Sequence, residues 1–171
     1  MKIETLLEAD ARWSSKLRVA EQPGVLRTLA ALIAHSGDSW FWGIGLGLFL
    51  LLGNSYQIYV SFHMLASIFV TAVIVLVLKL IVRRRRPEGK WGGIYRNTDP
   101  HSFPSGHAAR ATMLMVLSIG LWPSWLAAIM ILWAPLVSLA RVSMGVHYLS
   151  DVIAGSFLGF LIGVSWLLLL T

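Results

Sequence analysis

The segment from Tyr56 to Val82 constrains the fold more than any other part of the chain, because it is almost entirely apolar. A helix crosses the hydrocarbon core of a bilayer with about 20 predominantly apolar residues, and this segment exceeds that length. A run of four arginines and then Pro87 follow it, and such a charged cluster with a proline ends a membrane helix. Hydrophobic residues make up 57% of the whole chain. The sequence therefore predicts an integral membrane protein.

Other apolar segments surround this span and predict a helical bundle. Further helices are expected over residues 103–121, 124–140 and 147–170. Residues 25–35 and 39–52 are each short for a full crossing, so the two segments are expected to share one. Between them, Ser36, Gly37 and Asp38 are expected to break the first helix and cap the second. The predicted fold class is all-α, an integral membrane bundle of about five to six helices.

The N-terminal residues 1–36 differ in composition from the rest of the chain. Leu6, Leu7 and Trp13 alternate with basic and acidic residues, which is typical of an amphipathic helix that lies at the membrane interface. Residues 25–35 are apolar but short, which also favours an interfacial position. A partly ordered tail is the alternative interpretation of the first part of this region.

The basic residues lie beside the apolar segments and give the chain a formal net charge of +6. This placement favours membrane lipids with acidic head groups as partners over nucleic acid, which needs a basic face on a soluble domain. If the chain crosses once between His35 and Gly53, nearly every Lys and Arg lies on one side. The bias predicts a multi-pass protein of the cell membrane, and it favours the cytoplasmic face over the outer face for that side, with the outer face kept as the alternative. No pattern in the sequence indicates an oligomeric state.

Small residues repeat at every fourth position along the last predicted span. Gly155, Gly159 and Gly163 continue the spacing of His147 and Asp151. Small residues let two helices approach closely in a bilayer, so this face is expected to pack against a neighbouring helix with His147 at its end. Generic glycine packing explains the glycines equally well, but it does not explain the histidine and the aspartate.

His147 is a candidate nucleophile because Asp151 follows it four residues later. That spacing places both side chains on one face of a helix. A carboxylate that accepts the Nδ1 proton leaves Nε2 free to attack. Ionisable side chains beside membrane spans are unfavourable unless they line a site, so the pair indicates function.

The remaining polar groups suit a phosphate as the target of this histidine. Ser105 and Gly106 stand at the start of a predicted helix, where free backbone N–H groups favour an anion. His107 follows them and can protonate a leaving oxygen. Arg and Lys side chains bind phosphate oxygens, and three of them are expected at the site: Lys79, Arg86 and Arg141. Their basic neighbours are interpreted as a cluster that faces lipid head groups: Arg83, Arg84 and Arg85.

This set of residues predicts covalent catalysis. His147 would form a phosphohistidine, His107 would protonate the leaving group, and water would hydrolyse the intermediate. No metal or other cofactor is expected, because the cations supply the positive charge and no cluster of carboxylates suited to Mg²⁺ is present in the sequence.

The same residues resemble the signature of the type 2 phosphatidic acid phosphatases. That signature is Lys, six residues, Arg-Pro; then Pro-Ser-Gly-His; then Ser-Arg, five residues, His, three residues, Asp. The order and every internal spacing match here, with the motifs at Lys79 and Arg86-Pro87, at residues 104–107, and at Arg141, His147 and Asp151. The departure is Ala140, where the family usually has the serine, and we expect this change to tune activity rather than abolish it.

The resemblance implies a role for each matched residue. His147 is the nucleophile, His107 the general acid, and Asp151 the residue that orients His147. The phosphate cradle that the resemblance implies consists of Lys79, Arg86, Ser105, Gly106 and Arg141.

The resemblance also implies a fold and an activity. It implies a helical membrane phosphatase that removes a terminal phosphate from a lipid phosphomonoester or a polyprenyl (di)phosphate. Two alternatives remain, a phosphotransferase on the same scaffold and a non-catalytic protein that binds or transports lipid phosphates. We accordingly divide the chain into N-terminal amphipathic and interfacial helices, residues 1–36, and a transmembrane catalytic bundle, residues 37–171.

Overall fold

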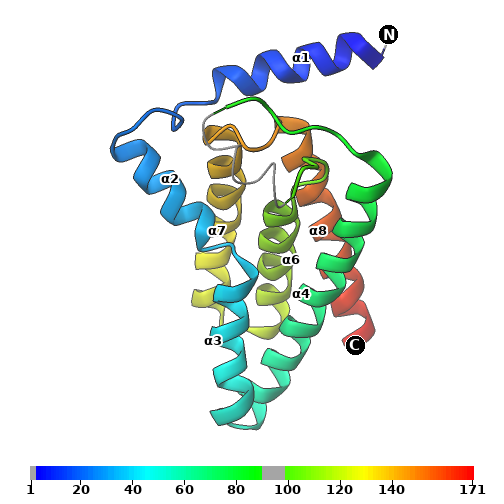
Figure 1. The fold of residues 1–171 in the computed structure, drawn as a ribbon. Coiled ribbons are helices and arrows are strands. Elements are labelled where there is room, and N and C mark those ends of the chain that lie inside the picture. The colour runs from blue at the N-terminus through cyan, green and yellow to red at the C-terminus, as the bar shows by residue number, and fades with distance from the viewer. Residues whose placement is uncertain (1–2, 90–98) are drawn as a thin grey trace.

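The computed structural model describes residues 3–89 and 99–171, and the named secondary-structure elements in these residues are helices (Figure 1). In chain order the helices are α1 (Ile3–Lys16), α2 (Val25–His35), α3 (Ser39–Leu52), α4 (Ser55–Val82), α6 (Gly106–Leu121), α7 (Ser124–Ser143) and α8 (Leu149–Leu170).

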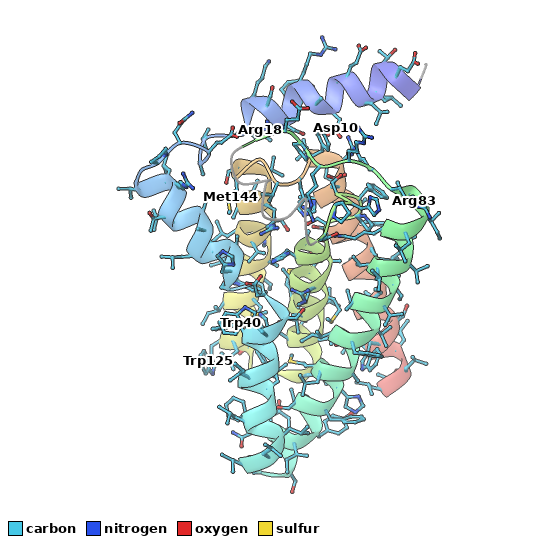
Figure 2. The ribbon with its side chains drawn as sticks, viewed as in Figure 1. Asp10, Arg18, Trp40, Arg83, Trp125 and Met144 are labelled. Atoms are coloured by element: carbon cyan, nitrogen blue, oxygen red, sulfur yellow. The ribbon has the colours of Figure 1, made fainter. Side chains whose placement is uncertain are left out.

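Helices α4, α7 and α8 are long and apolar enough to cross a membrane, whereas α2, α3 and α6 are apolar but shorter. Large apolar side chains are exposed on the outer surface of the bundle, among them Trp40 and Trp125, each 63% exposed (Figure 2). A water-soluble protein rarely exposes so much apolar surface, whereas lipid tails accept it. The predicted all-α membrane fold is confirmed.

Helices α2 and α3 follow one another along one side of the bundle, with a break between them (Figure 1). Two short helices that follow one another, here with α2 inclined to α3 (Figure 1), span more of the bundle than either does alone. This arrangement fits the interpretation that the two segments share one crossing. The break itself, from Ser36 to Asp38, lies against the centre of the molecule, because Gly37 packs closely on Val137 of α7.

Helix α6 forms the centre of the bundle and packs against α4, α7 and α8. The glycine stripe of α8 faces it: a Cβ on Gly155 would overlap the carbonyl oxygen of Ser105, and one on Gly159 would overlap that of Ala109. The backbones of α6 and α8 can approach this closely only because these positions lack side chains. The predicted close packing of this face is confirmed, with α6 as the neighbour.

Local signals set the ends of the helices beside the site. Helix α4 ends at Arg83, whose left-handed backbone (φ 50°) turns the chain and whose N–H donates to the Lys79 carbonyl. The sequence predicts that the last helix begins at His147, and this is wrong: helix α8 begins at Leu149, so His147 lies in the preceding turn. Gly145 allows that turn, because its φ of +69° is unfavourable for other residues.

Helix α1 lies across one end of the bundle (Figure 1). Its Trp13 is exposed, whereas Ser14 is fully buried and its Oγ accepts the N–H of Leu149 at 2.8 Å. Asp10, one turn earlier, accepts the N–H of Ser150 at 3.1 Å. The first turn of α8 is therefore held by α1, and the division of the chain at residue 36 stays a prediction.

Candidate active site

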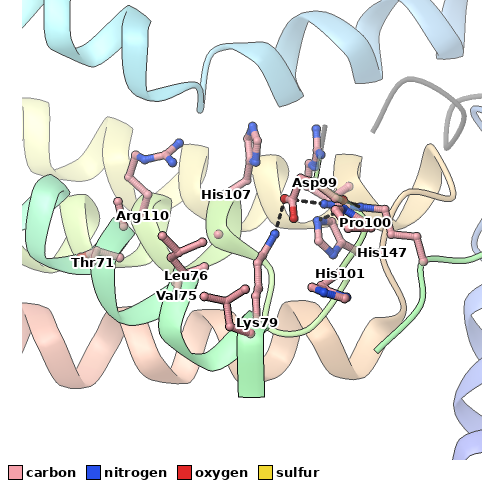
Figure 3. Close-up of a pocket in the computed structure, with 15 residues that line it drawn as sticks. Thr71, Val75, Leu76, Lys79, Asp99, Pro100, His101, His107, Arg110 and His147 are labelled. Carbon is pink, nitrogen blue, oxygen red and sulfur yellow. Dashed lines mark hydrogen bonds and ion pairs between the residues drawn. The ribbon is translucent and has the colours of Figure 1, made fainter. Parts of the chain in front are cut away.

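A cavity of about 470 Å³ opens between α4 and α6 at the end of the bundle where α1 lies (Figure 3). Six of the eight residues predicted for the site line it: Lys79, Arg86, Gly106, His107, Arg141 and His147. They come from α4, α6, α7 and the connections between helices, so the fold brings the three sequence motifs together. Ser105 and Asp151 lie behind this lining.

His147 is 1% exposed and reaches the cavity from the turn between α7 and α8. Its Nε2 lies 3.2 Å from Nη1 of Arg86, and its Nδ1 lies 3.6 Å from Oδ2 of Asp151. Burial, together with the charges of Arg141 and Arg86, lowers the pKa of His147 well below its ordinary value. The imidazole is therefore neutral at neutral pH, which is the form with a free nitrogen lone pair.

Asp151 sits beside His147 as predicted, at a distance longer than a hydrogen bond. Its Oδ2 accepts the backbone N–H of Tyr148 at 2.8 Å, so the carboxylate also caps the first turn of α8. Its Oδ1 accepts from Arg84 at 2.8 Å, and Arg84 also donates to Asp10 at 2.7 Å. Arg84 therefore helps to hold Asp151 in place, and its interpretation as a residue that faces lipid head groups is wrong.

The three predicted cations are all buried: Lys79, Arg86 and Arg141. Asp99, which no sequence motif indicates, joins two of them. Its carboxylate accepts from Lys79 Nζ and, at 2.8 Å, from Arg86 Nη2 (Figure 3). Burial alone would raise the pKa of Asp99. The contacts with Lys79 and Arg86 together outweigh burial, so the pKa of Asp99 lies below its ordinary value. An ionised carboxylate thus occupies the position where an anion would meet these cations.

Ser105 and Gly106 begin α6 as predicted. The Ser105 hydroxyl accepts the N–H of Ala108 and caps the helix, and the Ser105 N–H donates to the carbonyl of Asp151 at 2.9 Å. The hydroxyl oxygen and the backbone N–H of Ser105 are therefore both engaged within the protein. Gly106 and His107 present the start of the helix to the cavity.

His107 contacts the carboxylate of Asp38, for which the sequence predicts a different role. Asp38 is predicted as a helix cap, and it does take the N-cap position of α3, but its side chain makes no capping bond. Its Oδ1 instead lies 2.6 Å from Nε2 of His107. One turn further along α6, Arg110 also lines the cavity and donates to the carbonyl of Gly37. The break between α2 and α3 is thus part of the site's wall.

These features define a class of protein: a helical membrane protein whose cationic cavity holds two histidines, each beside a carboxylate. The chain belongs to the PAP2 superfamily, whose family model matches residues 60–171. The predicted family and the enzyme class, a PAP2-type phosphatase, are confirmed.

Known relatives agree in sequence and in fold. The decaprenylphosphoryl-5-phosphoribose phosphatase of Mycobacterium tuberculosis is 32% identical over 85% of this chain and 80% of its own. The undecaprenyl-diphosphatase of Sulfolobus acidocaldarius is 30% identical over 84% of this chain and 70% of its own. The crystal structure of a PAP2-type phosphatidylglycerolphosphate phosphatase from Bacillus subtilis has a similar fold, with a TM-score of 0.75 at 23% identity over 96% of this chain and 86% of its own.

Proposed function

We propose that this protein is a membrane-embedded lipid phosphatase that hydrolyses a terminal phosphate through a phosphohistidine on His147, without a metal ion. The observation that carries the proposal is the position of Nε2 of His147 in the cavity, beside Arg86. A neutral imidazole in contact with a guanidinium is a nucleophile placed next to a phosphate-binding group.

In the first step, Nε2 of His147 attacks phosphorus, and the bond between phosphorus and the leaving oxygen breaks. His107 gives that oxygen a proton. Lys79, Arg86 and Arg141 neutralise the equatorial oxygens, together with N–H groups at the start of α6. In the second step, His107 takes a proton from water, the hydroxide attacks phosphorus, and the bond to His147 breaks to release phosphate. The three cations provide the charge that a metal ion provides in other phosphatases.

A lipid substrate is supported by where the cavity opens. Leu76 and Leu80 of α4 line it, and both are more than half exposed on the outer surface of the bundle. A phosphate in the cavity would therefore leave its apolar tail on the lipid-facing side of α4. Two relatives are named for polyprenyl substrates, which favours a polyprenyl phosphate or diphosphate here. By the excess of basic residues on the site's side, we place the cavity at the cytoplasmic face of the cell membrane.

The proposal is tested by phosphate release from a lipid panel, using the purified protein in detergent with EDTA present. The panel consists of a polyprenyl diphosphate, a polyprenyl phosphate, phosphatidic acid and phosphatidylglycerol phosphate. We expect release in EDTA, highest with the polyprenyl substrates, and a transient protein-bound phosphate that is stable in base and labile in acid. Loss of activity in EDTA that Mg²⁺ restores would contradict the metal-independent mechanism. Phosphate transferred to an added alcohol in place of water would identify a phosphotransferase.

Asp99 is expected to compete with the phosphate group for Lys79 and Arg86. Asp99→Asn removes the competing charge but keeps the shape of the side chain, so inorganic phosphate should inhibit the variant at a concentration about 10-fold lower than it inhibits the wild type. The measurement is the inhibition constant of phosphate against lipid hydrolysis. Glu88→Gln, an exposed acid near the same connection, is the matched control and should leave this constant unchanged. Weaker inhibition of Asp99→Asn would show instead that Asp99 holds the two cations in place for phosphate.

A further inference from the structure

The break between α2 and α3 brings a second carboxylate to the site, and its contact with a histidine is the shorter of the two. Asp38 Oδ1 lies 2.6 Å from His107 Nε2, within hydrogen-bond distance, whereas Asp151 lies 3.6 Å from His147. Asp38 is separated from His107 by 69 positions in the sequence. Neither the catalytic steps above nor the sequence motifs use it.

The Asp38 carboxylate is fixed in position from several sides. Its Oδ2 contacts Nδ1 of His35 at 2.9 Å and Nε1 of Trp40 at 3.2 Å, which leaves Oδ1 for His107. The backbone around it is also held, because Arg110 donates to the carbonyl of Gly37. A carboxylate held in this way restricts the orientation of the imidazole that it contacts.

Charge gives Asp38 a second effect on His107. Four cationic side chains already line the cavity: Lys79, Arg86, Arg110 and Arg141. A protonated His107 would add a fifth positive charge. An adjacent carboxylate offsets that repulsion. The Asp38 carboxylate, 2.6 Å from Nε2, therefore favours the protonated, acid form of His107 over what the cations alone would allow.

We propose that Asp38 is the positioning residue of the general acid: it accepts the Nε2–H of His107, so that the proton His107 transfers is the one on Nδ1. This inference rests on the proposed function, in which His107 is the acid. When the bond from phosphorus to the leaving oxygen breaks, the Nδ1 proton moves to that oxygen. When water attacks the phosphohistidine, Nδ1 takes a proton from it. The Nε2–H stays on His107 and donates to Asp38 throughout, and Asp38 itself remains ionised.

The test compares two leaving groups, because only a basic one needs the acid. A polyprenyl phosphate releases an alkoxide that must be protonated, whereas p-nitrophenyl phosphate releases a stable phenolate. For Asp38→Asn we expect kcat/KM to fall about 100-fold with the polyprenyl phosphate and less than about 3-fold with p-nitrophenyl phosphate. The parameter kcat/KM reports the steps up to departure of the leaving group, so the later attack of water does not obscure the comparison.

The control variant makes the same change from an acid to an amide away from the cavity. Glu88 is exposed and lies outside the cavity lining. Glu88→Gln should keep kcat/KM within about 3-fold of the wild type with either substrate. Asp38→Glu keeps the charge but moves it, so it should recover part of the activity with the polyprenyl phosphate.

The outcomes separate this inference from the proposed function. If the wild type hydrolyses neither substrate, the proposed function fails. If the wild type hydrolyses both and Asp38→Asn loses both equally, Asp38 has only a structural role and the inference is wrong. If Asp38→Asn does not fold, Asp38→Glu carries the same comparison: a loss confined to the polyprenyl phosphate supports the inference, and an equal loss or no loss with either substrate overturns it.

Discussion

Replacing His147 with asparagine should lower phosphate release from every lipid of the panel by at least about 10⁴-fold, because the proposed mechanism has no other group to form the bond to phosphorus. Asparagine keeps a polar side chain of moderate size in a position that is 1% exposed, next to Arg86 and Asp151. We therefore expect a folded protein that still binds inorganic phosphate through its cations. The measurements are initial rates in EDTA and the yield of protein-bound phosphate after an acid-free quench, and both should fall together.

The chain offers a matched control for this substitution. His63 lies on α4 with its ring against Tyr59 and Phe62, outside the cavity lining. His63→Asn makes the same chemical change and should keep the rate within about 3-fold of the wild type. Should His147→Asn retain a tenth of the wild-type rate or more, His147 is not the nucleophile. Protein-bound phosphate that persists in that variant would point to another residue.

Gly159→Ala should destabilise the protein by about 3 kcal/mol, although alanine is the better helix former by about 1 kcal/mol. The added methyl group would overlap the carbonyl oxygen of Ala109, and a backbone atom cannot move aside as a flexible side chain does. Helices α6 and α8 would have to separate. We expect the melting temperature in detergent to fall by roughly 10 °C. Activity should fall as well, because α6 carries His107 and α8 carries Asp151.

Gly45→Ala is the control for this prediction. Gly45 lies in the interior of α3, and a Cβ there would meet no other atom within 4 Å. The same substitution should therefore leave the melting temperature unchanged or raise it slightly, in line with the helix propensity of alanine. An equal effect of the two substitutions would show that contact between α6 and α8 is not the reason for the glycine at position 159.

The catalytic motifs could be predicted because their spacing is local and specific. Lys79 and Arg86 lie on either side of the end of α4, and Gly106 and His107 open α6, as the sequence pattern indicates. The prediction that one helix contains both His147 and Asp151 is wrong, because α8 begins at Leu149 and His147 lies in the turn before it. Nevertheless the two side chains lie together, since a turn that ends in a capping carboxylate brings that carboxylate back beside the preceding residues.

The supporting acids could not be predicted in the same way. Asp38 carries a clear local signal for helix capping, and that signal placed it correctly at a helix start but assigned its side chain to the wrong partner. Asp99 lies in a connection with no periodic pattern, so nothing in its own surroundings indicates that it meets Lys79. Arg84 resembles its three arginine neighbours in sequence, and only its contacts with Asp10 and Asp151 distinguish it.

The sequence by itself determined that this protein is a helical membrane bundle with the three motifs of a phosphatase, because hydropathy, helix ends and motif spacing are properties of neighbouring residues. The tertiary structure alone decided which acid serves which base. His107 and Asp38 are 69 positions apart, and Arg84 and Asp10 are 74 positions apart. Such pairs depend on how α1 and the break between α2 and α3 pack on the bundle, and an ion pair between distant segments leaves no periodic trace along the chain.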